Sequence, residues 1–186
     1  FIVRISPYFL FFLVLHKIII LDLKIFYVLL SYCFIVVFGI FIHCTFVISM
    51  IVYKKTGMTP IKFAKSIMPA ILTAWSTASS SASIPVSLSC LSKMHANKKI
   101  SEFVLPLGIT INMNGTALYE GASVVFIAQL FGIDLSIYQQ VILFAASIIA
   151  SIGTAGIPGA AIVTMGICLN AVCVPNDGIG IIMVVE

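Results

Sequence analysis

The chain has 186 residues, of which 61% are hydrophobic and only 9% are charged. Soluble globular proteins carry roughly 25% charged residues, so this composition excludes an ordinary soluble domain and indicates an integral membrane protein. The formal net charge is +4, and all ten Lys and Arg residues lie at or before Lys99. This asymmetry indicates a membrane topology rather than nucleic-acid binding.

Residues 1–57 predict two membrane helices. Apolar residues fill 1–20 and 25–53, and about 20 such residues suffice to cross a bilayer. Because both ends of the chain lie in apolar sequence, we expect a piece of a longer protein. His43 lies inside the second helix, where an ionisable side chain is either functional or a neutral imidazole bonded to a neighbouring helix.

Seven lysines predict which side of the membrane the next connections face. They lie after the second helix and around residue 95, and they are Lys54, Lys55, Lys62, Lys65, Lys93, Lys98 and Lys99. Cytoplasmic loops of membrane proteins carry an excess of Lys and Arg, so both connections should be cytoplasmic. Asp134 and Asp177 then fall on the opposite side.

Residues 59–95 predict a helical hairpin that enters and leaves the membrane on one side. Pro60 suits the first turn of a helix, which runs to about Trp75. Serine-rich sequence follows from Ser76 to Pro85, and apolar residues then return and end at Lys93. Each arm is too short to span a bilayer, and lysines flank both ends. The alternative is a flexible serine-rich linker.

Residues 103–132 are apolar enough to span the membrane but contain Asn112-Met113-Asn114-Gly115-Thr116. A membrane helix is interrupted at this depth only where the freed backbone groups are buried in protein or face water or a ligand. Broken helices of this kind form the binding sites of many transporters. The motif therefore predicts a broken helix that lines a binding site.

Residues 137–175 repeat the hairpin design with glycines in place of serines. Two apolar arms flank Gly153-Thr154-Ala155-Gly156-Ile157-Pro158-Gly159, and glycine lets a backbone approach a ligand closely. Ala82-Ser83-Ile84-Pro85 of the first tip aligns with Ala155-Gly156-Ile157-Pro158 of the second. Such symmetry predicts an all-α, broken-helix, inverted-repeat transporter with two re-entrant helical hairpins. Residues 179–186 would start a last helix.

Three motifs, in this order, resemble the dicarboxylate/amino acid:cation symporters, which include glutamate and aspartate carriers. They are Ser79 to Pro85 in the first tip, Thr110 to Thr116 in the broken helix, and Ser151 to Gly159 in the second tip. Residues 1–57 look like the family's fifth and sixth helices. The resemblance implies a homotrimer at full length, in which a mobile transport domain, partly present here as 58–186, moves against a static scaffold.

The resemblance also implies which residues bind the substrate, an acidic amino acid or dicarboxylate. They would be Ser79, Ser80, Ser81, Thr116, Ile157 and Gly159. Main-chain amides at hairpin tips and helix starts suit an anion, because they combine hydrogen bonds with a positive dipole end. Ala78 stands where archaeal members carry an arginine, so the substrate's countercharge is expected from sequence beyond Glu186.

Sodium would be the coupling ion, bound by oxygen atoms, which suit a hard cation. The residues implied are Gly108, Thr110, Asn112, Asn114, Ser151, Ile152 and Thr154. The family's broken helix usually reads Asn-Met-Asp-Gly-Thr, and Asn114 replaces its aspartate. The lost charge removes on the order of 4 kcal/mol of cation attraction at an effective dielectric of 20, so this cation site should be weak or absent.

Glu120 is the one carboxylate between Glu102 and Asp134. A carboxylate buried in a membrane costs several kcal/mol unless it is paired or protonated. In animal glutamate carriers a glutamate in a similar setting is taken to carry the coupled proton, so the resemblance implies proton coupling at Glu120. A structural hydrogen bond to a neighbouring helix is the alternative.

The sequence therefore predicts cation-coupled symport, by Na⁺, H⁺ or both, through a multi-pass protein of the cell membrane. Neither an enzymatic activity nor a further cofactor nor nucleic acid is expected, and lipid is the expected surrounding. An intramembrane serine protease is disfavoured because no G-x-S-x-G is present. The alternative is an inactive piece of a split or decayed carrier gene, to which Asn114 and both apolar ends point.

Overall fold

The structure, a computed structural model, describes residues 23–183. Within this range every regular element is a helix. The elements in chain order are α2 (Leu23–Ile42), η1 (His43–Ile48), α3 (Ser49–Thr56), α4 (Pro60–Thr77), α5 (Ile84–Lys93), α6 (Lys98–Ile111), α7 (Asn114–Leu130), α8 (Ile137–Gly153), α9 (Ala160–Ala171), η2 (Asn176–Gly178) and α10 (Ile179–Ile182). The helix expected in 1–20 and the last three residues of 179–186 lie outside the described residues.

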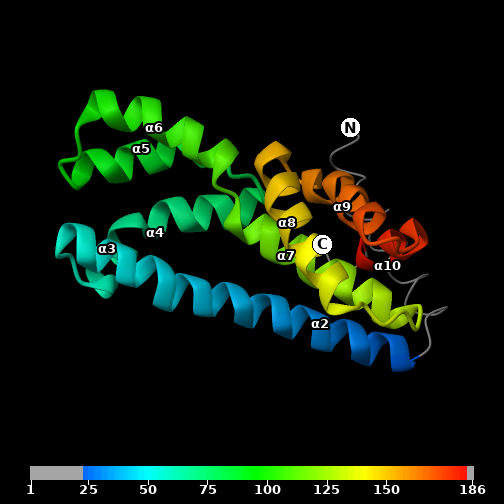
Figure 1. The fold of residues 1–186 in the computed structure, drawn as a ribbon. Coiled ribbons are helices and arrows are strands. Elements are labelled where there is room, and N and C mark those ends of the chain that lie inside the picture. Colours follow the sequence, from blue (N-terminus) through cyan, green and yellow to red (C-terminus); the bar gives the residue numbers. More distant parts are fainter. Residues whose placement is uncertain (1–22, 184–186) are drawn as a thin grey trace, which may run out of the picture.

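α2, η1 and α3 form one long helical rod, blue to cyan in Figure 1, which contacts α7 along α2 and α4 along α3. Tyr27–Thr56 is the one helix among the described residues that is long and apolar enough to cross a membrane. Its middle turn, His43–Ile48, is π-helical. Such turns are rare and often occur at functional sites.

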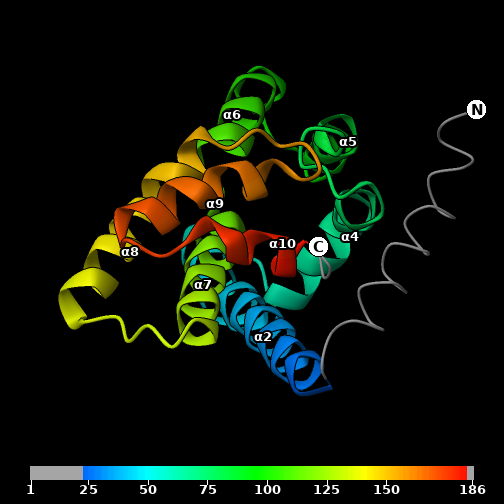
Figure 2. The same cartoon turned by 90° about the vertical axis from the view of Figure 1, so that its right-hand side faces the viewer.

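Two helical hairpins follow, α4 with α5 and α8 with α9 (Figure 1). The first has its loop at 78–83, where Ala78 ends α4 in a left-handed conformation with φ 47°. The second has its loop at 154–159, where Gly159 precedes α9 with φ 76°, a conformation that glycine adopts without strain. In Figure 2 the orange loop between α8 and α9 reaches toward the green segments around α4 and α5.

The predicted interruption is present between α6 and α7, and it is shorter than the sequence motif. Only Asn112 and Met113 lie outside the two helices. Asn114, Gly115 and Thr116 already belong to the first turn of α7, because the Met113 carbonyl accepts the Ala117 amide at 3.1 Å. The freed backbone groups are therefore the carbonyls in the last turn of α6 and the amides in the first turn of α7, on either side of these two residues.

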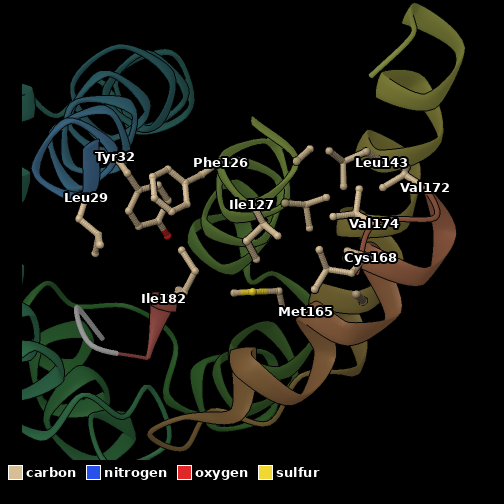
Figure 3. Close-up of a cluster of buried hydrophobic side chains, with 14 residues drawn as sticks. Leu29, Tyr32, Phe126, Ile127, Leu143, Met165, Cys168, Val172, Val174 and Ile182 are labelled. Atoms are coloured by element: carbon tan, nitrogen blue, oxygen red, sulfur yellow. The ribbon is translucent and has the colours of Figure 1, made fainter. Parts of the chain in front are cut away.

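The core lies around α7, which contacts α2, α8 and α9 (Figure 2). In Figure 3, Ile127 of α7, Met165 of α9 and Ile182 of α10 point toward one another, and all three are fully buried. Gly178 lies so close to Ile127 that a Cβ there would be 2.4 Å from its Cγ2. This packing fixes the start of α10 against the last turn of α7.

Candidate functional site

The two hairpin loops meet directly. The Ser81 amide and the Ser79 hydroxyl both donate to the Gly156 carbonyl, at 3.1 Å and 2.7 Å. A Cβ at Gly156 would lie 2.7 Å from Ser81 Oγ and 3.1 Å from Ser81 N. Glycine is therefore required for this approach, which joins loops that lie 77 residues apart in the chain.

A pocket of about 500 Å³ opens where the two loops face the start of α7. Four of the six residues predicted to bind substrate line it, namely Ser80, Thr116, Ile157 and Gly159. The other two, Ser79 and Ser81, hold the Gly156 carbonyl instead. The structure thus places all six around the junction of the two loops.

The residues predicted to bind sodium fall into separate places. Gly108, Asn112 and Asn114 line a second pocket of about 370 Å³, whereas Thr154 lines the first. The remaining three, Thr110, Ser151 and Ile152, line neither of these two pockets.

The hydroxyl groups among these residues are bonded to their own helices. Thr110 Oγ1 donates to the Leu107 carbonyl at 2.9 Å, and Ser151 Oγ donates to the Ile148 carbonyl at 2.8 Å. These bonds use the hydroxyl proton and leave oxygen lone pairs free, so each hydroxyl can still act as an oxygen ligand.

His43, at the start of the π-helical turn, contacts the broken helix. Its Nε2 lies 3.4 Å from Asn114 Nδ2, and both side chains line the second pocket. Of the two alternatives for His43, the structure shows the contact with a neighbouring helix, α7. No sequence signal could have paired these two residues, because they lie 71 positions apart on segments that only the fold brings together.

Glu120 is fully buried between α7 and α9. Thr164 Oγ1 donates to its Oε1, and Cys168 Sγ lies 3.8 Å from its Oε2. The one ion pair among residues 23–183 is the exposed Lys98–Glu102 pair at 3.8 Å, so Glu120 is held by hydrogen bonds without a cation. This favours the protonated form or a strongly hydrogen-bonded carboxylate.

Sequence reasoning missed both partners of Glu120. Thr164 and Cys168 are four residues apart, so the helical period puts them on one face of α9. That spacing could have identified them as a pair, but it could not have shown that the face packs against α7.

An apolar chain of helices, in which two hairpin loops meet beside an interrupted helix, is typical of the class of helical membrane transporters. The sequence profile of the sodium:dicarboxylate symporter family matches residues 1–186. The chain therefore belongs to this family, which is a family of transporters rather than enzymes and places the chain in a membrane.

The chain is similar to several curated animal proteins. It is 44% identical to mouse (Mus musculus) excitatory amino acid transporter 3 over 177 residues, which are 94% of this chain and 34% of that protein. It is 42% identical to human (Homo sapiens) excitatory amino acid transporter 5 over 81% of this chain and 27% of that protein. A putative sodium-dependent excitatory amino acid transporter of Caenorhabditis elegans, glt-4, is 42% identical over 80% of this chain and 30% of that protein. The chain spans about a third of the length of these relatives.

Proposed function

We propose that this chain forms the substrate- and ion-binding part of a secondary active carrier, which moves an acidic amino acid or dicarboxylate together with Na⁺, H⁺ or both. The observation that carries the proposal is the contact of the two hairpin loops at Gly156, beside the break between α6 and α7. Family membership and the names of the similar excitatory amino acid transporters support the same class of substrate.

The substrate binds in the pocket of about 500 Å³ between the loops and α7. The described residues that line it include no Lys or Arg. An anion would therefore be held by main-chain amides at the first turns of α7 and α9, both of which line the pocket, and by hydroxyl groups. Ser79, Ser80, Ser81, Thr116, Ile157 and Gly159 are the proposed substrate contacts.

Sodium binds at two places in this proposal. The first uses Thr110, Ser151, Ile152 and Thr154, and the second uses Gly108 and Asn112. The site at Asn114 is weak, because an amide replaces a carboxylate and His43 already contacts it. Glu120 carries the coupled proton, since its burial without a cationic partner makes uptake of a proton favourable.

The first hairpin enters and leaves the membrane on the cytoplasmic side, the second hairpin, which lies between Asp134 and Asp177, does so on the outer side, and α2 to α3 crosses the membrane. At full length the carrier is a homotrimer of the cell membrane, and residues 58–186 belong to a transport domain that moves as an elevator. Two observations favour this reading: the apolar surface that α2 exposes, and the second helix of each hairpin, α5 with 10 residues and α9 with 12 residues, which is shorter than a full span.

A chimera tests the proposal. This chain replaces the matching 177 residues of mouse excitatory amino acid transporter 3, and uptake of labelled glutamate and aspartate is measured in sodium and in choline buffer. Sodium-dependent uptake above the level of a Gly156→Val control is expected. Correct delivery to the membrane without uptake would favour the alternative, an inactive piece of a split or decayed carrier gene.

A further inference from the structure

Thr164 on α9 bonds in two directions. Its hydroxyl donates to Glu120 Oε1 on α7 and lies 3.0 Å from the hydroxyl of Thr154, at the start of the second hairpin loop. Thr154 Oγ1 in turn lies 2.9 Å from the Ala150 carbonyl. Glu120 and Thr154 are buried, with 0% and 4% of their surfaces exposed. A chain of hydrogen bonds therefore runs from the carboxyl group to the second loop.

The direction in which these hydrogen bonds point depends on whether Glu120 is ionised or protonated. A threonine hydroxyl has one proton and two lone pairs, whereas an ionised carboxylate only accepts. When Glu120 is ionised, the Thr164 hydroxyl donates its proton to Glu120. The Thr154 hydroxyl can then donate to the Thr164 oxygen. When Glu120 carries a proton, it donates to Thr164, Thr164 donates to Thr154, and Thr154 donates to the Ala150 carbonyl. Each threonine hydroxyl keeps its own proton and only rotates, and the one proton added is the one that Glu120 gains.

These two arrangements differ in what Thr154 offers to a cation. With Glu120 ionised, both lone pairs of Thr154 Oγ1 are free. With Glu120 protonated, one of them accepts the proton of Thr164. The oxygen is therefore a better cation ligand in the first arrangement, and by linkage a cation bound there favours the ionised carboxylate by the same factor.

We infer that Thr164 is a positioning residue that couples the protonation of Glu120 to cation binding at Thr154 Oγ1. The inference rests on the proposed function, in which Thr154 is a sodium ligand, and it deepens that function by naming the link between the two coupling ions. Without Thr164, the proton and sodium sites would communicate only through the direct attraction of their charges.

Other titratable groups around Glu120 lie off this path. Cys168 of α9 is 3.8 Å from Oε2, the carboxyl oxygen that Thr164 does not touch. From α2, Tyr32 faces α7 with its hydroxyl 2.6 Å from Ser123 Oγ. The buried residues of α8, which are Leu143, Ser147, Ala150 and Ser151, carry no titratable group. Thr164 is therefore the residue whose removal should interrupt the coupling.

The test uses the full-length carrier and two substitutions of Thr164. Thr164→Val keeps the shape of the side chain and removes the hydroxyl, whereas Thr164→Ser keeps the hydroxyl. Thr73→Val is the matched control, because Thr73 is another half-buried helical threonine whose hydroxyl donates to a carbonyl of its own helix, that of Pro69, at 2.8 Å. The sodium concentration that half-saturates uptake is measured in acidic and in alkaline buffer.

We expect this concentration to be at least about fivefold higher in acidic buffer for the unchanged carrier, Thr164→Ser and Thr73→Val, because one hydrogen bond of typical net strength alone gives a ratio of about fivefold. In Thr164→Val this ratio should be about fivefold smaller, because only the direct attraction between the charges remains. A ratio that Thr164→Val leaves unchanged would overturn the inference, because direct attraction between the charges would then explain the coupling.

A second readout needs no transport. Infrared difference spectra record the carboxyl band of Glu120, identified by its loss in Glu120→Gln, as sodium is added. Sodium should perturb this band in the unchanged carrier and in Thr164→Ser, and clearly less in Thr164→Val. Sodium-dependent uptake without this perturbation would overturn the inference and leave the proposed function standing. Absence of both sodium binding and uptake would overturn the proposed function, and the inference with it.

Discussion

At the scale of single residues, the contact between the two hairpin loops depends on Gly156, which has no side chain. Its carbonyl accepts two hydrogen bonds from the first loop, and its Cα faces Ser81 without room for a Cβ. The serine side chain could rotate away from a new Cβ, but the Ser81 backbone nitrogen could not. The junction of the loops therefore depends on this glycine.

Gly156→Ala should separate the loops and weaken substrate binding. The loss of two hydrogen bonds of about 1 kcal/mol each predicts a rise of roughly tenfold or more in the substrate concentration that half-saturates uptake. The control is Gly166→Ala on α9, where a Cβ meets nothing within 4 Å. Equal uptake curves for the two variants would contradict the role of the loop junction.

Asn114 is the residue at which this chain departs from its family's motif, and it is exposed toward His43. Asn114→Asp restores a carboxylate and should lower the half-saturating sodium concentration. Because the position is exposed, solvent screens the new charge, and a change of about fivefold is expected rather than the larger effect of a buried site.

The control for this substitution is Asn97→Asp, which adds the same charge at the exposed start of α6. Uptake as a function of sodium is measured for both variants. A sodium response that is the same in Asn114→Asp as in the unchanged carrier would show that the motif's aspartate position does not face a cation here.

At the scale of helices, the close approach of Gly178 to Ile127 positions α10 on α7. Gly178→Ala would place a Cβ 2.4 Å from Ile127 Cγ2, and overpacking of this kind costs about 1–3 kcal/mol. The melting temperature of the purified protein in lipid should fall. A double variant that also carries Ile127→Ala should lose less stability than the sum of the two single changes, because Ile127→Ala removes both of the carbon atoms in closest contact, Cγ1 and Cγ2.

Gly180→Ala is the control for this effect, since a Cβ there meets nothing within 4 Å. If the melting temperatures of Gly178→Ala and Gly180→Ala agreed, α10 would not depend on this contact. A double variant that is less stable than the sum of the two single changes would also contradict it.

The helices were easier to predict than their contacts. Pro60, the serine-rich stretch after Trp75 and Lys93 mark the first hairpin by local chemistry, and the structure has α4 and α5 there. The break at Asn112 was visible because polar residues interrupt an apolar run. The length of the break could not be predicted, because asparagine and threonine are also compatible with the first turn of a helix. Asn114 and Thr116 lie in the first turn of α7.

The contacts across the fold could not be predicted from the sequence. The bonds of Gly156 to the first loop, of Thr164 to Glu120 and of His43 to Asn114 each join segments more than 40 positions apart. Such pairs depend on how helices pack, and no local pattern specifies that. The resemblance to a family supplied the candidate residues, whereas the structure supplied their partners.

At the scale of the whole molecule, the proposed topology has the first hairpin enter and leave the membrane on one side. Lys55 and Lys98 should then both face the cytoplasm, and Asp134 should face outside. Single cysteines at these positions, in a background without the native cysteines, are labelled with a membrane-impermeant maleimide. Labelling of Lys55→Cys and Lys98→Cys from opposite sides would mean that the hairpin crosses the membrane completely.

The central claim is that substrate binds between the two loops, in a manner that depends on sodium. Ile157 lines that pocket and is 58% exposed, so Ile157→Cys in the full-length carrier should react with a maleimide. We predict that glutamate or aspartate slows this reaction in sodium buffer and not in choline buffer, and that Ile137→Cys, at the exposed start of α8, is unaffected. A labelling rate at Ile157→Cys that neither substrate changes in sodium would contradict it.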